Sequence, residues 1–255
     1  MKVLSLVILF ALGSRPAFAQ HYLAAGGGFS LMQLKSSDLD RFQLTYNFVN
    51  SQSGQTALLQ GFDLGIGLSG EVSYRHLGKW SKALAVGYQE SKATDVASFL
   101  DGTIRRFKLR IRQYYLQPGF GYTNKDIFVD GIATIFLCRA LQLDSRLVGS
   151  TSANPLTGIY NSEASLAVDA GMAFGFVSGP IMLILKVTYP IRKSGDKEIL
   201  TDPAPAKVAD NRSAFPDDYI NFLAGLPYRG VSSDIDGVKV MMTLKYAVNL
   251  SKRRR

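Results

Sequence analysis

Apolar and polar residues alternate along several segments of the chain, as in β-strands whose two faces meet different surroundings. In 62–76 the apolar set from Phe62 to Tyr74 alternates with small or charged residues, and 162–176 and 238–250 repeat the pattern. Together with looser matches, the alternation predicts eight strands, at 22–34, 62–76, 80–89, 104–122, 126–142, 162–176, 180–191 and 238–250.

The apolar positions change parity within 104–122. Phe107, Leu109 and Ile111 are odd-numbered, whereas the apolar residues from Leu116 to Tyr122 are even-numbered. If every apolar residue faces outward, a β-bulge near 112–113 must reset the register. This interpretation turns the basic side chains of the segment inward.

Short and long connections alternate between the predicted strands. The short ones are 77–79, 123–125 and 177–179, and the long ones are 35–61, 90–103, 143–161 and 192–236. After residue 19, no stretch approaches the roughly 20 apolar residues of a membrane helix. The predicted fold is therefore an all-β, eight-stranded antiparallel up-and-down transmembrane β-barrel, with long extracellular loops that carry short helices.

Aromatic residues support this orientation, because amphipathic rings prefer the two membrane interfaces. Those predicted near the short turns are Tyr74, Trp80, Tyr122, Phe174 and Phe176, and those near the long loops are Phe62, Tyr88, Phe107 and Tyr189. The alternative is a soluble sandwich or lipocalin-like barrel with the apolar face inside. It would expose Glu71, Arg110 and Asp169 and bury the interface aromatics.

The N-terminus has the three parts of a secretory signal peptide: Lys2, an apolar run over 3–12 and the site Ala17-Phe18-Ala19. We expect cleavage after Ala19. The predicted organisation is a signal peptide (1–19), an outer-membrane barrel (20–251) and a basic periplasmic tail (252–255). The expected location is the outer membrane of a Gram-negative bacterium.

The amino-acid composition restricts the catalytic and metal-binding sites that the chain can form. The 255 residues include one Cys and two His, with a net charge of +9, which excludes an internal disulfide framework and leaves little for a zinc site. His21 and His76 both fall at the periplasmic end, so a His-dependent hydrolase site at the outer rim has no base. We expect no enzyme activity and no cofactor, and Cys138 is predicted to be a small buried hydrophobe.

In its pattern of strands and turns, the chain resembles the small eight-stranded outer-membrane barrels of Gram-negative bacteria, of the OmpA-like or OmpX-like kind. It is most similar to the Bacteroidota outer-membrane β-barrel domain. The resemblance covers 22–250 and is strongest in 114–122, Tyr-Tyr-Leu-Gln-Pro-Gly-Phe-Gly-Tyr. The chain lacks the terminal Phe of the proteobacterial pattern and ends on a run of basic residues.

Eight strands enclose a lumen that side chains can fill, so inward charges should pair with one another. The predicted lumen charge network comprises Glu71, Arg106, Lys108, Arg110, Arg112, Asp130, Glu163, Asp169, Lys186 and Lys245. The alternative is a narrow anion-preferring channel, porin-like, lined by the basic residues of the fourth strand.

Two long loops contain helical patterns. In 35–61, Ser37 or Asp38 can cap a helix with Leu39, Phe42, Tyr46 and Val49 on one face, and 216–224 carries Tyr219, Ile220, Phe222 and Leu223. These faces either pack on one another or over the barrel mouth, or they bind a partner. The favoured hypothesis is a non-enzymatic barrel whose loops 35–61 and 192–236 bind a protein partner or support a cell-envelope complex. Its surroundings are outer-membrane lipid, and no nucleic-acid partner is expected.

Overall fold

The computed structural model describes residues 19–51, 54–149, 157–164, 167–192, 235 and 237–251. These residues form ten strands and one helix, α2 (Ser37–Ser51). The strands are β1 (Gln20–Gln33), β2 (Gln55–Ala57), β3 (Leu64–Leu77), β4 (Trp80–Phe99), β5 (Ile104–Asn124), β6 (Ile127–Val148), β7 (Gly158–Ala164), β8 (Ala167–Ser178), β9 (Ile181–Arg192) and β10 (Lys239–Asn249).

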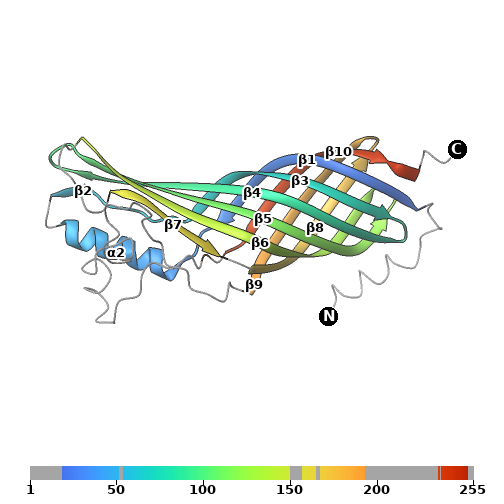
Figure 1. Ribbon diagram of the computed structural model, residues 1–255, viewed down its shortest axis with the longest axis horizontal. Coiled ribbons are helices and arrows are strands. Elements are labelled where there is room, and N and C mark those ends of the chain that lie inside the picture. The colour runs from blue at the N-terminus through green and yellow to red at the C-terminus, as the bar shows by residue number, and fades with distance from the viewer. Residues whose placement is uncertain are drawn as a thin grey trace.

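The strands are joined by antiparallel ladders that run in a ring. The order is β1, β3, β4, β5, β6, β8, β9 and β10, and β10 pairs again with β1. The short strand β2 pairs with β4, and β7 pairs with β6. Figure 1 shows the tilted strands of this barrel. The predicted all-β antiparallel barrel architecture is confirmed.

The two faces of the ring differ as the alternation predicts. Along β3, Ile66, Leu68 and Val72 are exposed on the outside, whereas Glu71 and Arg75 are buried. The outer faces of β8, β9 and β10 are likewise apolar and exposed. An apolar exterior around a polar interior is the arrangement of a transmembrane barrel and the reverse of a soluble one.

Small residues make room for large ones inside the ring. A Cβ on Gly175 would lie 1.9 Å from the ring of Phe128, and a Cβ on Gly87 would lie 2.4 Å from Tyr115. Both aromatic rings are fully buried. The interior is therefore packed with side chains, as expected for a barrel of this width.

Three strands continue far beyond the rest of the barrel at the end that carries the long loops, here called the long-loop end. β4, β5 and β6 contain 20, 21 and 22 residues, and Figure 1 shows them projecting to one side with α2 beneath them. The predicted loop 90–103 is thus mostly strand, with a turn after Phe99. In the predicted loop 143–161, 143–148 belongs to β6 and 158–161 to β7, and the predicted strand 162–176 is divided between β7 and β8.

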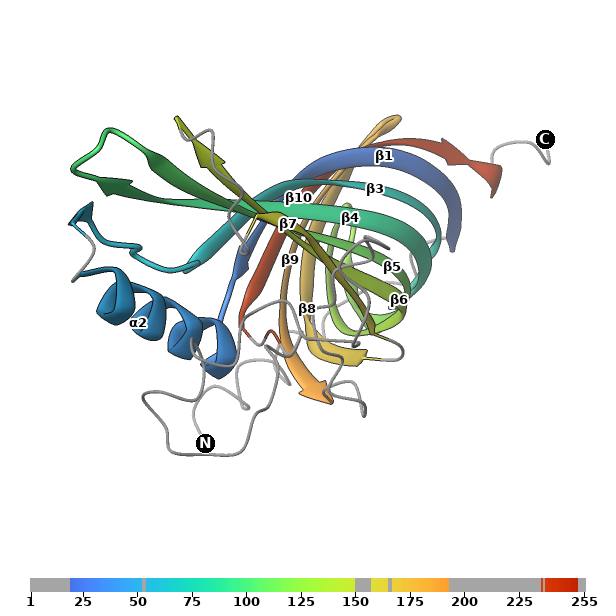
Figure 2. The same ribbon diagram turned by 60° about the vertical axis from the view of Figure 1, so that its left-hand side comes forward.

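Helix α2 packs on the inner face of this extension (Figure 2). Its buried residues Phe42 and Tyr46 meet the ring of Phe107 edge-on, with centroids 5.3 and 5.6 Å apart. The surrounding apolar cluster includes Met32, Leu34, Leu39, Leu59, Leu109, Ile111, Leu141 and Leu143. The predicted loop helix is confirmed, and its apolar face packs within the chain.

The start of α2 differs in one detail from the prediction. The Oγ of Ser36, one residue before the predicted cap at Ser37 or Asp38, accepts a hydrogen bond from the N–H of Leu39 at 3.4 Å. The backbone N–H of Asp40 also donates to the carbonyl of Ser36, at 3.0 Å. Ser36 therefore occupies the N-cap position, three residues before Leu39.

Candidate functional site

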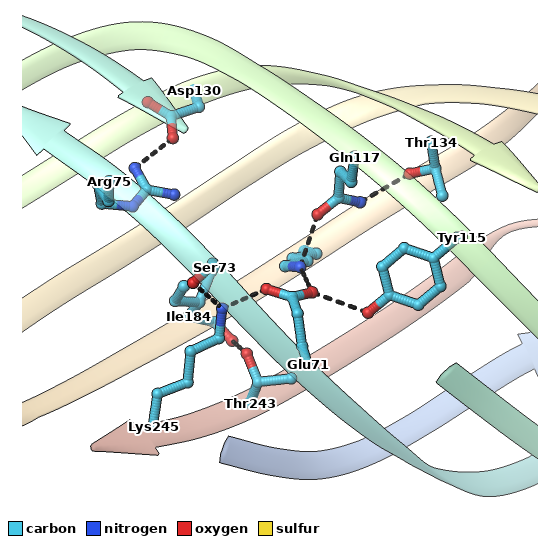
Figure 3. A network of polar contacts seen from close by, with 11 residues as sticks. Glu71, Ser73, Arg75, Tyr115, Gln117, Asp130, Thr134, Ile184, Thr243 and Lys245 are labelled. Atoms are coloured by element: carbon cyan, nitrogen blue, oxygen red, sulfur yellow. Dashed lines mark hydrogen bonds and ion pairs between the residues drawn. The ribbon is translucent and has the colours of Figure 1, made fainter. Parts of the chain in front are cut away.

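A polar network fills the middle of the lumen around Glu71 (Figure 3). Its carboxylate, on β3, pairs with Lys186 and Lys245 from the neighbouring strands β9 and β10 and accepts a hydrogen bond from the hydroxyl of Tyr115 at 2.7 Å. Lys186 also donates to Gln117 at 2.6 Å, and Lys245 donates to Ser73 at 2.8 Å. All of these side chains are buried, so the two ammonium groups share one carboxylate out of contact with bulk solvent.

Two further ion pairs lie on either side of this centre. Arg75 pairs with Asp130 towards the short-turn end, and its guanidinium lies 3.6 Å from the centre of the Phe128 ring. Towards the long-loop end, Lys239 pairs with Asp169 at 2.6 Å. The network therefore crosses the lumen at three levels.

The predicted lumen residues divide into two groups. Glu71, Asp130, Asp169, Lys186 and Lys245 lie inside the ring and pair there. The sequence reasoning missed Arg75 and Lys239, although each has the same parity as a predicted inward residue of its own strand. The side chain of Glu163 lies outside the described residues.

Arg106, Lys108, Arg110 and Arg112 correct the prediction, because they point out of the barrel. Phe107, Leu109 and Ile111 point inward and are buried beneath α2. β5 keeps one register through 112–113, and the bulge lies in β6, where Leu137 is the extra residue opposite Tyr114 and Tyr115. The parity of the apolar positions changes because this half of β5 lies beyond the apolar band, the belt of outward apolar residues around the barrel. Beyond that band, apolar side chains are buried inside and charged ones face solvent.

The outward charges of the extension form one surface, here called the basic outer face. It consists of Lys92, Arg106, Lys108, Arg110, Arg112 and Arg146 with the two acids Glu90 and Asp144, which the ladders of β4, β5 and β6 place side by side. Glu90 pairs with Lys92 at 2.7 Å and with Arg110 at 3.1 Å. Asp144 pairs with Arg146 at 2.9 Å.

The basic outer face begins immediately beyond a pair of aromatic rings. Tyr88 and Tyr114 lie opposite each other on β4 and β5, with ring centroids 5.0 Å apart. Glu90 is two positions further along and accepts a hydrogen bond from the Tyr88 hydroxyl at 2.8 Å. The hydrogen bond from Lys92 lowers the pKa of Glu90 to about 2, so this carboxylate stays charged in mild acid.

Most of the predicted interface aromatics lie on the outside. Tyr74, Trp80, Phe174, Phe176 and Tyr189 are exposed, and Trp80 stacks on Phe120 at 5.5 Å. Tyr88 and Tyr122 are partly exposed. Two predictions are wrong: Phe107 is fully buried, and Phe62 precedes β3 and packs against the apolar cluster under α2.

The remaining candidates give a mixed outcome. His21 and His76 lie at the short-turn end, with ring centroids 4.6 Å apart. Cys138 is exposed beside the β6 bulge, so its prediction as a buried residue is wrong. The loop residues Tyr219, Ile220, Phe222 and Leu223 fall outside the described part of the chain. In that part, no group of three or more His, Cys, Asp or Glu is placed to hold a metal ion.

No protein-family model matches the chain, and no curated protein matches it in sequence. Among solved structures it is similar to Ail, the attachment invasion locus protein of Yersinia pestis in complex with the heparin analogue sucrose octasulfate, with a TM-score of 0.41, 10% identity and coverage of 90% of this chain and 99% of that chain. It is also similar to the outer membrane protease OmpT from Escherichia coli, with a TM-score of 0.38, 10% identity and coverage of 94% and 100%. The outer membrane protein OprG from Pseudomonas aeruginosa gives a TM-score of 0.35, 12% identity and coverage of 90% and 96%.

The class of the protein follows from its own architecture. A ring of antiparallel ladders, an apolar exterior and paired charges inside define a β-barrel of the outer-membrane type. No helix within the described residues is long and apolar enough to cross a membrane.

Proposed function

We propose that the protein is a non-enzymatic integral outer-membrane β-barrel that displays a folded platform outside the cell for a protein partner or an envelope complex. The platform comprises α2 and the parts of β4, β5 and β6 beyond Tyr88 and Tyr114. The chain reaches the outer membrane after cleavage of the signal peptide 1–19. The observation that carries this proposal is a packed structure, with its own apolar cluster, on a barrel whose lumen is filled.

The filled lumen favours a barrel that displays a binding platform over a barrel that conducts anions. Three levels of ion pairs cross the interior, and Tyr115 and Phe128 occupy the space between them. The alternative function, an anion path along the fourth predicted strand, loses its lining, because those cations lie on the outer face.

The platform offers apolar side chains at its far end. Leu100, in the turn between β4 and β5, is 80% exposed, and Leu44 on α2 and Leu58 beside β2 are also exposed. Exposed apolar groups on a rigid support are suited to binding another protein. Loop 35–61 contributes to this surface directly, and we retain 192–236 as the second contributing loop.

Site-specific photo-crosslinking tests the proposal in cells. A photoreactive amino acid at Leu100 is expected to give a discrete protein adduct. The matched control is the same amino acid at Leu244, an exposed position of the apolar band, which should give no protein adduct. Equal adducts at both positions, or none at Leu100, would count against a partner at the platform.

Membrane fractionation and bilayer recording test the other two parts of the proposal. The protein should fractionate with the outer membrane and migrate faster on gels when unheated, and recovery in the soluble periplasm would contradict this location. In planar bilayers the purified barrel should show no steady conductance. Sizeable, reproducible single-channel steps would favour the channel instead.

A further inference from the structure

The basic outer face carries more charge than its acids can balance. Six cations surround two carboxylates, an excess of four positive charges. Glu90 is shared among Lys92, Arg110 and Arg112, and Asp144 is bound by Arg146. Within the described residues, neither Arg106 nor Lys108 forms an ion pair. Arg106 and Lys108 are therefore available to bind an external anion.

The surface also has a hollow that can receive such an anion. Arg106, Lys108, Asp144 and Arg146 line a cavity of about 180 Å³ on the outer side of β5 and β6. Two contacts hold Arg146 in place, at 2.9 and 3.0 Å from the oxygens of Asp144. Three cations around one carboxylate leave the hollow positive. A phosphate group, with several oxygens that accept charge-assisted hydrogen bonds, suits this lining.

The position of the surface identifies the source of the phosphate. Arg112 lies on the same face of β5 as Tyr114, one step further towards the long-loop end, and Tyr114 with Tyr88 forms the last aromatic pair before the outward residues of β4 and β5 become charged. From Arg112 to Arg106 the stripe extends along the strand by roughly 20 Å. The head groups of lipids lie just beyond the hydrocarbon region, so the lower cations meet them first. Soluble anions would require no such alignment with the lipid edge.

We propose that the basic outer face binds the phosphate groups of the outer-leaflet glycolipid in the membrane that surrounds the barrel. This inference rests on the proposed outer-membrane location. The lower cations, Lys92, Arg110 and Arg112, contact phosphates next to the hydrocarbon. The upper hollow at Arg106, Lys108 and Arg146 receives phosphates carried further out on the sugars. Bound glycolipid molecules thereby line one side of the platform.

The test is a binding titration of the purified full-length barrel in non-ionic detergent micelles with a fluorescent phosphorylated glycolipid. The triple variant Arg106→Gln, Lys108→Gln and Arg112→Gln should bind roughly a hundredfold more weakly, because each basic group near an anionic surface contributes several-fold in affinity. The matched control is Lys79→Gln, Lys82→Gln and Lys125→Gln, which removes as many charges at the short-turn end and should bind like the wild type.

Two further arms identify the ligand. The same glycolipid without its phosphates should bind at least tenfold more weakly to the wild type, and raising the salt from about 50 to 500 mM should weaken only the phosphorylated form. Inorganic phosphate should compete poorly. Full competition by inorganic phosphate would show a site for the free ion and overturn the assignment to lipid.

The proposal about lipid can fail separately from the proposed function. Each variant is first checked for heat-modifiable migration and for insertion into phosphatidylcholine vesicles. Failure of the wild type to insert would overturn the membrane location itself. Normal insertion with equal affinity of the wild type and the basic-face variant for the phosphorylated glycolipid would overturn only the lipid site.

Discussion

Replacing Glu71 with Gln tests whether the lumen network holds the barrel together. Glu71 is the shared counter-ion of Lys186 and Lys245, and all three side chains are buried. The amide retains the size of the carboxylate but removes its charge, which leaves two like charges close together in a dry interior. Removing one partner of a buried ion pair costs about 3–5 kcal/mol. We expect Glu71→Gln to lower the free energy of unfolding by about that amount.

The measurement is a urea titration of the barrel in lipid vesicles, with the heat-modifiable gel band as the measure of folded protein. Glu90→Gln provides the matched control, because Glu90 makes comparable ion pairs at the exposed rim and should cost no more than about 1 kcal/mol. A rescue variant, Glu71→Gln with Lys186→Met and Lys245→Met, should recover part of the loss, since it removes the two buried positive charges that Glu71→Gln leaves without a counter-ion.

A free energy of unfolding for Glu71→Gln within about 0.5 kcal/mol of the wild type, the range of an ordinary surface substitution, would refute a stabilising role for this network. A rescue variant that is less stable than the single variant would refute it as well. Either result would show that the two lysines do not depend on Glu71 for compensation.

Three other predictions concern faces and charge. Leu84→Arg, on the apolar exterior of β4 midway between Trp80 and Tyr88, should cost roughly 2–4 kcal/mol of stability in vesicles, whereas Ser69→Thr inside should be mild; equal tolerance in the same urea titration would mean the faces are reversed. Phe107→Ala should cost about 3–5 kcal/mol within the platform and speed proteolysis of α2 while the barrel stays heat-modifiable; unchanged proteolysis would contradict the packing. For Glu90, the lowered pKa means that its ion pairs stabilise fully above its ordinary pKa of 4.5 and are lost as pH falls towards 2. The stability difference between wild type and Glu90→Gln should therefore be constant from pH 8 to 6 and disappear near pH 2, and a difference that persists at pH 2 would contradict the pairing.

The alternation of apolar and polar residues predicted a strand correctly where its outer side faces lipid and its inner side faces the lumen along the whole strand. β3, β8, β9 and β10 have an apolar outside, and their inward positions carry the small and charged residues of the lumen together with a few apolar ones, such as Met182 and Ile184 on β9. Period-two patterning assigns both faces at once, because a shift of one residue would reverse every side chain.

The same rule failed on β5 because that strand passes out of the apolar band. Phe107 and Phe120 are both apolar, but one faces the cluster under α2 and the other faces outward near Trp80. Hydrophobicity alone does not state which side of a strand is covered. The real bulge, at Leu137, lies within an apolar stretch from Ile135 to Cys138 that carries no change of polarity.

The lumen network could be predicted in part. Inward charges follow from parity, and the same parity rule also identifies Arg75 and Lys239 as inward. Their partners do not follow from parity, because contact across the interior depends on the stagger of the strands around the ring. Glu71 meets Lys186 and Lys245 only through that stagger.

The outer side of β5 carries apolar residues from Tyr114 to Tyr122 and cations from Arg106 to Arg112. In a bilayer, the two halves oppose movement of the barrel along the membrane normal, one half in each direction. Sinking would drag arginines into hydrocarbon, and rising would expose Phe120 and its neighbours to water. The strand therefore fixes the depth of the barrel in the bilayer. As a result, the turn at Leu100 stays at a constant height above the lipid. The partner proposed above would then be kept at a fixed distance from the membrane surface.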